Sequence, residues 1–326
     1  MKISTILTLC IALVFTLQAQ TPTKVFGSSP PMTYFLYAIN PEKILGINFA
    51  PKNANNLGSK KYLKESFLEQ PVFGSFHGGS YNVNLETLIN ANPDLVLVWD
   101  ETLMLGSIEK SIYKTKLPTL LVPFKEVEDI PNAITIIANA IGEEKRGKQL
   151  SAYADQSIQN TKSRLKGLTP KRYYYAQGED GLATECSDSF HIVAFNFAGG
   201  ENVHQCKQSS RMGQERINAE TLLLYNPQVI IAQNRASYDA IYKNKLYAQI
   251  TAVKNKQVYI VPKTPFNWLD RPPSFMRILG SEWLLSIFHP DAYKEDIVQR
   301  VISFYALFLD VSLTQEEAQS ILRVEE

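Results

Sequence analysis

Several polar stretches of the chain carry side chains of the types that bind a charged or flat molecule. These stretches contain eight such side chains, three of them arginines and two of them tryptophans: His77, Tyr81, Trp99, Glu101, Arg211, Arg235, Trp268 and Arg271. A guanidinium group binds a carboxylate through two hydrogen bonds and stacks on a flat ring, and an indole offers a flat apolar face. We therefore predict that these eight side chains line one cleft for a planar or anionic ligand.

The chain offers few means of caging a bare metal ion. It has four histidines and three cysteines, and neither a His-Glu-x-x-His nor a Cys-x-x-Cys motif. Capture of a free cation, one alternative, needs several converging histidines or carboxylates, which the sequence does not display. We expect no intrinsic cofactor and expect a chelator to bring any metal. His77 is the one candidate for direct coordination, although we favour a hydrogen bond from its imidazole to the chelator.

Catalytic signatures are also few. The turn at His77-Gly78-Gly79 is similar to the oxyanion turn of lipases, but no Gly-x-Ser-x-Gly motif supplies a nucleophile. We therefore expect no catalytic residue and no enzymatic activity. The alternative from a different class is a secreted metal-dependent hydrolase that uses His77, Asp100 and Glu101, and turnover of ester or phosphoester substrates would reveal it.

An internal repeat supplies elements that position the candidate residues. Residues 84–97 and 218–231 match in register, and each copy begins Asn-x-Glu-Thr, passes an Asn-Pro pair and ends in Leu, Val or Ile. Each copy predicts a short helix with asparagine as N-cap and Glu86 or Glu220 in the first turn, where the helix dipole favours a carboxylate. The apolar run after each proline is typical of a strand buried on both faces of a parallel sheet. We therefore expect two related α/β lobes.

Shorter apolar runs complete the two predicted sheets. They cover residues 24–26, 44–49 and 119–122 in the first half and residues 172–176 and 258–261 in the second. Ligands of open α/β sheets bind beyond the carboxyl ends of the strands. Residues 99–101 and 233–235 follow the two repeated strands and hold equivalent positions, which favours a cleft between the lobes.

A long helix is expected between the halves. Residues 143–166 contain no proline and a single glycine, Gly147, and their apolar residues recur with helical period. The fold class we predict is α/β, with two Rossmann-like lobes of largely parallel sheet over residues 20–142 and 169–326. One long rigid helix over residues 143–168 joins them. Three further helices, at residues 274–288, 291–309 and 313–322, are assigned to the second lobe.

Composition and charge exclude several partners. Lys and Arg total 33 against 32 Asp and Glu, so no global basic field attracts nucleic acid or an anionic membrane. Residues 1–19 form a short apolar run with a small-residue cleavage signature and predict a cleaved signal peptide; a membrane span is the alternative. Cleavage removes Cys10 and leaves Cys186 and Cys206, for which we expect a disulfide, with two buried thiols as the alternative.

Taken together, the repeat, the linking helix and the signal-like start resemble a known family. The chain is similar to the periplasmic substrate-binding proteins of ABC importers, in the class whose lobes are joined by a helix. The residues that carry the resemblance are the two repeat copies, the segment Phe197-Ala-Gly-Gly-Glu-Asn-Val203 between them and the tail that begins at Pro265. The resemblance covers the chain after the signal peptide.

The resemblance implies a function, a location and partners. It implies a monomeric periplasmic receptor that captures a metal chelate between its lobes and delivers it to a permease and an ATPase at the inner membrane. Glu86 and Glu220 match the family's permease-docking positions, and His77 stands where the family often has an aromatic ligand contact. An iron–siderophore or related iron complex is the expected cargo; a nickel or cobalt chelate, haem or cobalamin is the alternative.

Overall fold

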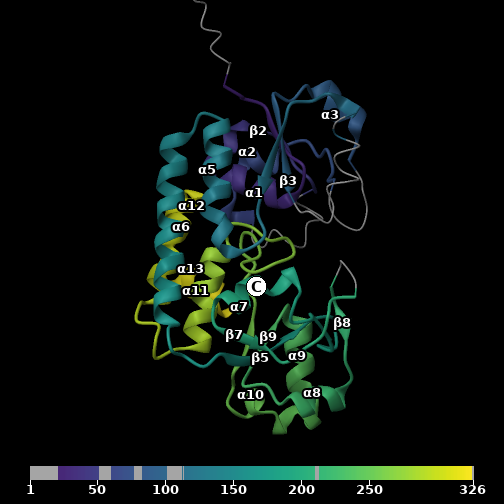
Figure 1. The fold of residues 1–326 in the computed structure, drawn as a ribbon, viewed down its shortest axis with the longest axis vertical. Coiled ribbons are helices and arrows are strands. Elements are labelled where there is room, and N and C mark those ends of the chain that lie inside the picture. The colour runs from purple at the N-terminus through teal and green to yellow at the C-terminus, as the bar shows by residue number, and fades with distance from the viewer. Residues whose placement is uncertain are drawn as a thin grey trace, which may run out of the picture.

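Two parallel sheets lie one above the other along the long axis of the molecule, and a layer of long helices runs beside both (Figure 1). The computed structural model describes residues 21–50, 60–76, 83–100, 112, 114–209 and 213–324. None of the described helices combines the length and the apolar character that crossing a bilayer requires. The predicted α/β fold with two lobes and a long helix is confirmed.

The first lobe contains a four-stranded parallel sheet in the order β2-β1-β3-β4. Its strands are β1 (Val25–Gly27), β2 (Ile44–Gly46), β3 (Leu95–Asp100) and β4 (Thr119–Pro123). Strand β3 lies inside the sheet, and five of its six residues are buried. Burial on both faces explains why this strand reads as an uninterrupted apolar run.

The second lobe contains a matching parallel sheet in the order β10-β9-β5-β7. Its strands are β5 (Lys171–Ala176), β7 (Gly200–Asn202), β9 (Val229–Ala232) and β10 (Val258–Ile260). A two-stranded antiparallel pair, β6 (Ala183–Thr184) with β8 (Glu215–Arg216), continues from the end of β5 through a main-chain bridge between Gln177 and Ala183. Edge strand β7 is not among the strands expected from the apolar runs, because its sequence Gly-Glu-Asn contains no apolar residue.

The two repeat copies fold in the same way. Helices α3 (Leu85–Ala91) and α8 (Ala219–Tyr225) have the same length, and the Asn84 and Asn218 side chains accept a hydrogen bond from the third residue of each helix. Each helix ends at an asparagine with left-handed backbone, after which the chain enters β3 or β9. The N-cap expectation therefore holds in both lobes.

Helix α6 (Glu144–Arg164) connects the lobes. Its buried face packs on α5 (Ile130–Ala140), and a Cβ atom at Gly147 would lie 2.3 Å from the Cβ of Ala138. The one glycine of this helix therefore allows the two helices to approach closely. On another side of α6, Ser157 donates a hydrogen bond to Glu282, whose carboxylate also binds the guanidinium of Arg300.

The C-terminal helices differ from the expectation that they belong to the second lobe. Helices α11 (Arg277–Phe288), α12 (Ile297–Leu309) and α13 (Gln315–Arg323) join the layer beside both sheets (Figure 1). From this layer, Tyr305 packs edge-on against Tyr62 of the first lobe, and Glu317 pairs with Lys61. An amphipathic pattern shows that a helix face is buried but does not identify the surface that covers it.

The remaining helices are short, except for one that lies against the first sheet. They are α1 (Pro30–Ile39), α2 (Glu65–Leu68), α7 (Val193–Phe197), α9 (Arg235–Lys243) and α10 (Thr251–Lys254). All ten residues of α1 are buried, and its Tyr34 stacks on Phe266 of the second half of the chain with ring centroids 3.9 Å apart. A single apolar core therefore extends from the first sheet through the helical layer to the second sheet.

A buried ionic cluster joins the two halves at the centre. The fully buried carboxylate of Asp270 binds the Arg277 guanidinium at 3.0 Å and the Nδ1 atom of His191. Arg277 also donates to the carbonyl of Lys125 in the first lobe at 2.9 Å and to that of Phe190 in the second at 3.0 Å. Burial raises the pKa of Asp270, but His191 and the neighbouring guanidinium groups outweigh it, so the pKa lies below its ordinary value.

Replacement of Arg277 by methionine tests this cluster. The variant leaves the buried Asp270 carboxylate without its nearer guanidinium partner, and we expect the free energy of unfolding to fall by about 3 to 5 kcal/mol in urea titrations. The matched control is Arg216→Met, which breaks an exposed, solvent-screened pair with Asp180 and should leave the unfolding midpoint nearly unchanged. Equal losses in the two variants would contradict the role of Arg277.

The same substitution has an expected pH dependence. Because the folded-state pKa of Asp270 is depressed, its contribution to stability is complete above the ordinary carboxyl pKa of about 4 and is lost as the pH falls through the folded-state value. Without Arg277 the depression is smaller. Acid unfolding followed by circular dichroism should therefore begin at a higher pH in Arg277→Met than in the parent.

Candidate functional site

The carboxyl ends of the strands in both sheets carry buried polar groups. In the first lobe, Ser29 follows β1 and Asp100 ends β3; in the second, Gln177 follows β5. Open α/β sheets bind their ligands at this edge. The candidate site is therefore defined as the polar groups at these strand ends together with the loop that contains Arg271.

Part of the site is a network around a second buried carboxylate. Glu185 is fully buried and accepts hydrogen bonds from Arg271 and, at 2.9 Å, from the Ser189 hydroxyl. The Nε atom of Arg271 also lies 3.8 Å from the Asp270 carboxylate. Burial lowers the pKa of Arg271, but the negative charges of Asp270 and Glu185 raise it by more. The pKa of Arg271 therefore lies above its ordinary value. Two protein carboxylates thus neutralise this arginine within the fold.

Several buried polar atoms at the strand ends have no hydrogen-bonding partner within the described ranges. They are the Ser29 hydroxyl, one oxygen of Asp100, the Tyr175 hydroxyl and both amide atoms of Gln177. The Gln177 amide lies near enough to Tyr175 to lower the pKa of its hydroxyl, but burial outweighs this and the pKa is raised. Buried polar groups are normally satisfied, so these strand ends hold unmet hydrogen-bonding capacity, at residues that are themselves fully buried except for the half-buried Asp100.

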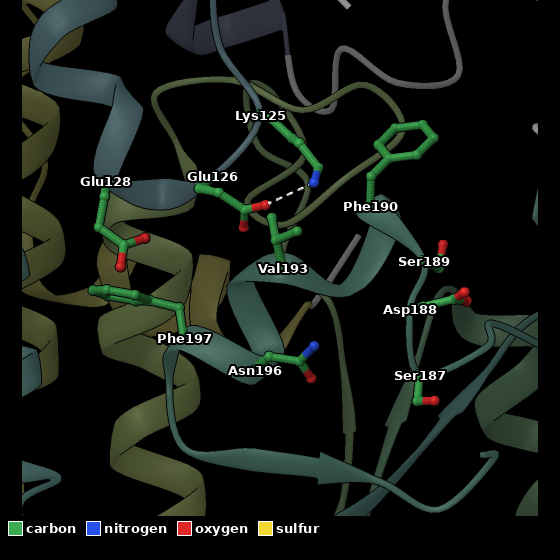
Figure 2. Close-up of a pocket in the computed structure, with 10 residues that line it drawn as sticks. All are labelled: Lys125, Glu126, Glu128, Ser187, Asp188, Ser189, Phe190, Val193, Asn196 and Phe197. Carbon is green, nitrogen blue, oxygen red and sulfur yellow. Dashed lines mark ion pairs between the residues drawn. The ribbon is translucent and has the colours of Figure 1, made fainter. Parts of the chain in front are cut away.

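A pocket of about 300 Å³ opens between the lobes beside this network. Its first-lobe wall contains the Lys125–Glu126 ion pair at 3.2 Å and Glu128, and its second-lobe wall contains residues 187–190 and α7 (Figure 2). Phe190 and Phe197 add apolar surface, and Ser189 connects the pocket wall to Glu185. Of the predicted residues that the structure describes, Trp99, Arg235, Trp268 and Arg271, none lines this pocket.

A second pocket of about 280 Å³ lies at the carboxyl ends of β9 and β10. Arg235 and Lys263 line it together with Val324, and Arg235 donates to the Val324 carbonyl at 3.1 Å. Figure 1 shows this end of the chain between the two lobes. Arg235 is therefore exposed at the predicted edge of the sheet, but part of its hydrogen bonding goes to the chain's own C-terminal segment.

Four of the eight predicted ligand contacts, including the candidate metal ligand His77, lie outside the described residues: His77, Tyr81, Glu101 and Arg211. Of the other four, Arg271 lies near the strand-end group Tyr175, and Arg235 lies at the carboxyl ends of β9 and β10 in the same sheet.

The two tryptophans are core residues, which corrects their predicted role. Trp268 is fully buried between Trp283 and Tyr305, and its indole donates to the Thr264 carbonyl at 3.1 Å. Trp99 is 6% exposed, and its indole donates to the Phe124 carbonyl at 2.7 Å. Neither ring offers an open flat face to a ligand, because the layer architecture covers the loop and the strand that carry them.

The other singled-out residues are placed as follows. Glu86 and Glu220 are exposed in the first turns of α3 and α8, which lie toward opposite ends of the long axis (Figure 1). Cys186 and Cys206 form a disulfide. It joins the segment after β6 to the segment after β7, next to Glu185.

Sequence reasoning missed Gln177, Glu185 and Asp270 as site-forming residues. Gln177 directly follows the predicted strand at residues 172–176, and its position at a strand end was an available signal. Glu185 and Asp270 gave no such signal, because an acidic residue in a loop is usually solvated. The burial of Glu185 depends on Arg271 from a distant part of the chain, and that of Asp270 depends on Arg277 and on the distant His191.

Comparison with known proteins places this geometry in a family. A family model described as a periplasmic binding protein matches residues 49–265, more than half of the chain. The structure of an ABC transporter solute binding protein from Sulfurospirillum deleyianum is similar with a TM-score of 0.89 and 35% identity, covering 93% of this chain and 94% of that one.

Two relatives of known cargo are more distant. The ferric enterobactin-binding periplasmic protein FepB of Escherichia coli is 26% identical over 278 residues, 77% of this chain and 82% of that protein. The vitamin B12-binding protein of Vibrio parahaemolyticus is 24% identical over 197 residues, 58% of this chain and 66% of that protein. The names of these two relatives describe different cargoes.

A pair of amide substitutions tests whether Gln177 is kept for binding. In Gln177→Leu an amide with no hydrogen-bonding partner among the described residues is replaced by an apolar group, so the free energy of unfolding should stay the same or rise. In the control Asn202→Leu, an equally buried amide that bonds the Glu185 carbonyl and the His204 amide is lost, and stability should fall by about 1 to 3 kcal/mol. Equal destabilisation in urea would show that Gln177 has a structural partner.

Proposed function

The chain belongs to the periplasmic binding protein family, the substrate-binding components of ABC importers, and on that premise we propose that its cargo is a metal chelate, an iron–siderophore or related iron complex. The observation that carries the proposal is the set of unpartnered polar atoms buried at the carboxyl ends of the strands in both lobes. These groups suit a ligand with several oxygen or nitrogen atoms on its outer surface.

The charge of the described site bears on how the cargo is recognised. Glu185 and Asp270 neutralise Arg271 and Arg277, so this part of the site adds no net positive charge. Recognition here therefore depends on hydrogen bonds from neutral groups such as Gln177 and Tyr175. A chelator that surrounds its metal presents such a surface, whereas a free cation needs converging ligands.

Other chelates of the same class are the alternative cargo. The match to a vitamin B12-binding protein favours cobalamin as one of them, and nickel or cobalt chelates and haem present similar planar or polar surfaces. The comparisons support transport rather than catalysis, since these relatives are named as binding proteins. We accordingly assign no catalytic role to His77, Asp100 or Glu101.

We also propose how the loaded protein meets its transporter. Substrate-binding proteins of ABC importers work with a permease and an ATPase. Glu86 and Glu220 are exposed carboxylates at equivalent points of the two repeated helices, and Asn84 and Asn218, not the glutamates, cap these helices. Two separated acidic points can orient the protein on a permease with basic groups.

Native mass spectrometry with elemental analysis tests the cargo assignment. Protein isolated from its own periplasm should carry about one iron per chain together with the mass of an organic chelator, and the chain should lack residues 1–19. Gln177→Leu should be isolated with about tenfold less cargo, because a hydrogen bond to the chelator is lost. Nickel, cobalt or a corrin in place of iron would favour the alternative, and bare metal without an organic mass would overturn the proposal.

The control for the cargo measurement is Gln159→Leu. Gln159 is exposed on α6, away from the strand ends, and the same chemical change there should leave cargo occupancy unaltered. Loss of cargo in both variants would indicate a general effect of the substitution and remove the support for Gln177.

Substitution of both docking glutamates tests the permease contact. Glu86→Ala with Glu220→Ala should lower cargo uptake by cells about tenfold or more while leaving cargo affinity of the purified protein within about twofold. The control Glu316→Ala removes an exposed first-turn glutamate of α13 and reproduces only the helix-dipole effect of about 0.3 to 1 kcal/mol. Normal uptake by the double variant would assign Glu86 and Glu220 to helix stability alone.

A further inference from the structure

A histidine lies beside the disulfide. Within the described ranges, one group of three cysteine, histidine or acidic side chains has ligand atoms that all lie within 4.8 Å of one another: Cys186, His204 and Cys206. We propose that these three residues bind a zinc-type divalent metal ion when the disulfide is reduced. The site adjoins the pocket in Figure 2, whose Ser187 donates to the Cys206 carbonyl, but none of the three residues lines that pocket and the proposal does not depend on the proposed cargo.

The residue types and spacing suit a tetrahedral metal. Thiolates and imidazoles are the preferred ligands of zinc, at about 2.3 Å for sulfur and 2.0 to 2.1 Å for nitrogen, so ligand atoms around the ion are separated by about 3.6 to 3.8 Å. Reduction breaks the bond between the sulfurs and lets them move apart to this distance. The ligand atoms lie within 4.8 Å of one another, so the His204 nitrogen reaches this spacing by a movement of at most about 1 Å.

Hydrogen bonds hold the two ligand-bearing segments together without the disulfide. The Asn202 amide donates to the Glu185 carbonyl at 2.8 Å and accepts from the His204 amide at 3.0 Å. Further along the chain, the main-chain N–H of Gln208 donates to the Asp188 carboxylate at 2.9 Å. These contacts flank both cysteines, so opening the disulfide leaves Cys186 and Cys206 as neighbours.

The orientation of His204 is also fixed. Its Nδ1 atom forms a 2.8 Å hydrogen bond with the hydroxyl of Tyr225, at the end of α8. Metal-binding histidines usually have such an outer partner on the nitrogen that does not bind the ion, because it sets the ring orientation. Cys206 and His204 are half-buried, so an ion and a reductant have access from solvent, and water can complete the coordination.

The chemistry requires a dithiol reductant. A thiolate of the reductant attacks the accessible sulfur of Cys206, which forms a mixed disulfide and releases the Cys186 thiolate. The second thiol of the reductant then breaks the mixed disulfide, leaving two protein thiols and an oxidised reductant. Binding of a divalent ion displaces the two thiol protons and gives a metal dithiolate, to which neutral His204 adds without further proton loss.

Zinc titration of the full chain in both redox states tests the proposal. Protein reduced by dithiothreitol and desalted under nitrogen should bind one Zn²⁺ per chain in native mass spectrometry, at least about 100-fold more tightly than oxidised protein. Co²⁺ added to the reduced protein should give thiolate-to-cobalt charge-transfer absorption. Absence of both signals, or unfolding of the reduced chain by circular dichroism, would overturn the proposal.

Histidine variants identify the third ligand. His204→Gln should weaken Zn²⁺ binding by the reduced protein by about tenfold or more, and Tyr225→Phe should weaken it by a smaller factor. The matched control is His289→Gln, whose ring bonds the Gly199 carbonyl and which belongs to no such group. If His204→Gln binds zinc like the parent and the His289 control, the cysteines alone hold the ion and the three-residue site is wrong.

Discussion

Placement of the Asp270 carboxylate in the interior constrains the rest of the structure. A buried charge needs a partner of opposite sign and hydrogen bonds for its remaining lone pairs. Arg277 and His191 supply them, and the two terminal nitrogens of Arg277 also donate to main-chain carbonyls of both lobes. Because these bonds meet at one guanidinium group, the loop after β10, the first-lobe segment at Lys125 and the start of α7 are fixed relative to one another.

This junction and the shared core limit how the lobes move. Helix α6 packs continuously on α5 and α11, and the apolar cluster includes residues from both sheets. Wide opening would expose that cluster and break the contacts of Arg277. The structure therefore favours small adjustments at the pocket in Figure 2 over hinge motion of the kind that closes other periplasmic receptors.

The same ionic cluster changes how the binding edge recognises a ligand. Arg271 has the type and position expected of an anion-binding residue, but Glu185 and Asp270 neutralise it inside the fold. Neutral groups such as Gln177 and Tyr175 are then left for a ligand. Cys186 directly follows Glu185, so the disulfide also lies next to this network.

The sequence alone determined the features that depend on local pattern. The Asn-x-Glu-Thr repeats predicted α3, α8 and the strands after them, because N-caps and buried apolar runs are set by neighbouring residues. The proline-free stretch around Gly147 predicted the linking helix. Tertiary structure alone decided that Trp268 lies in the core, that α12 and α13 pack beside both lobes, and that the distant carboxylate of Glu185 pairs with Arg271. Burial and charge pairing depend on groups brought together from distant positions, and no local pattern records which groups those are.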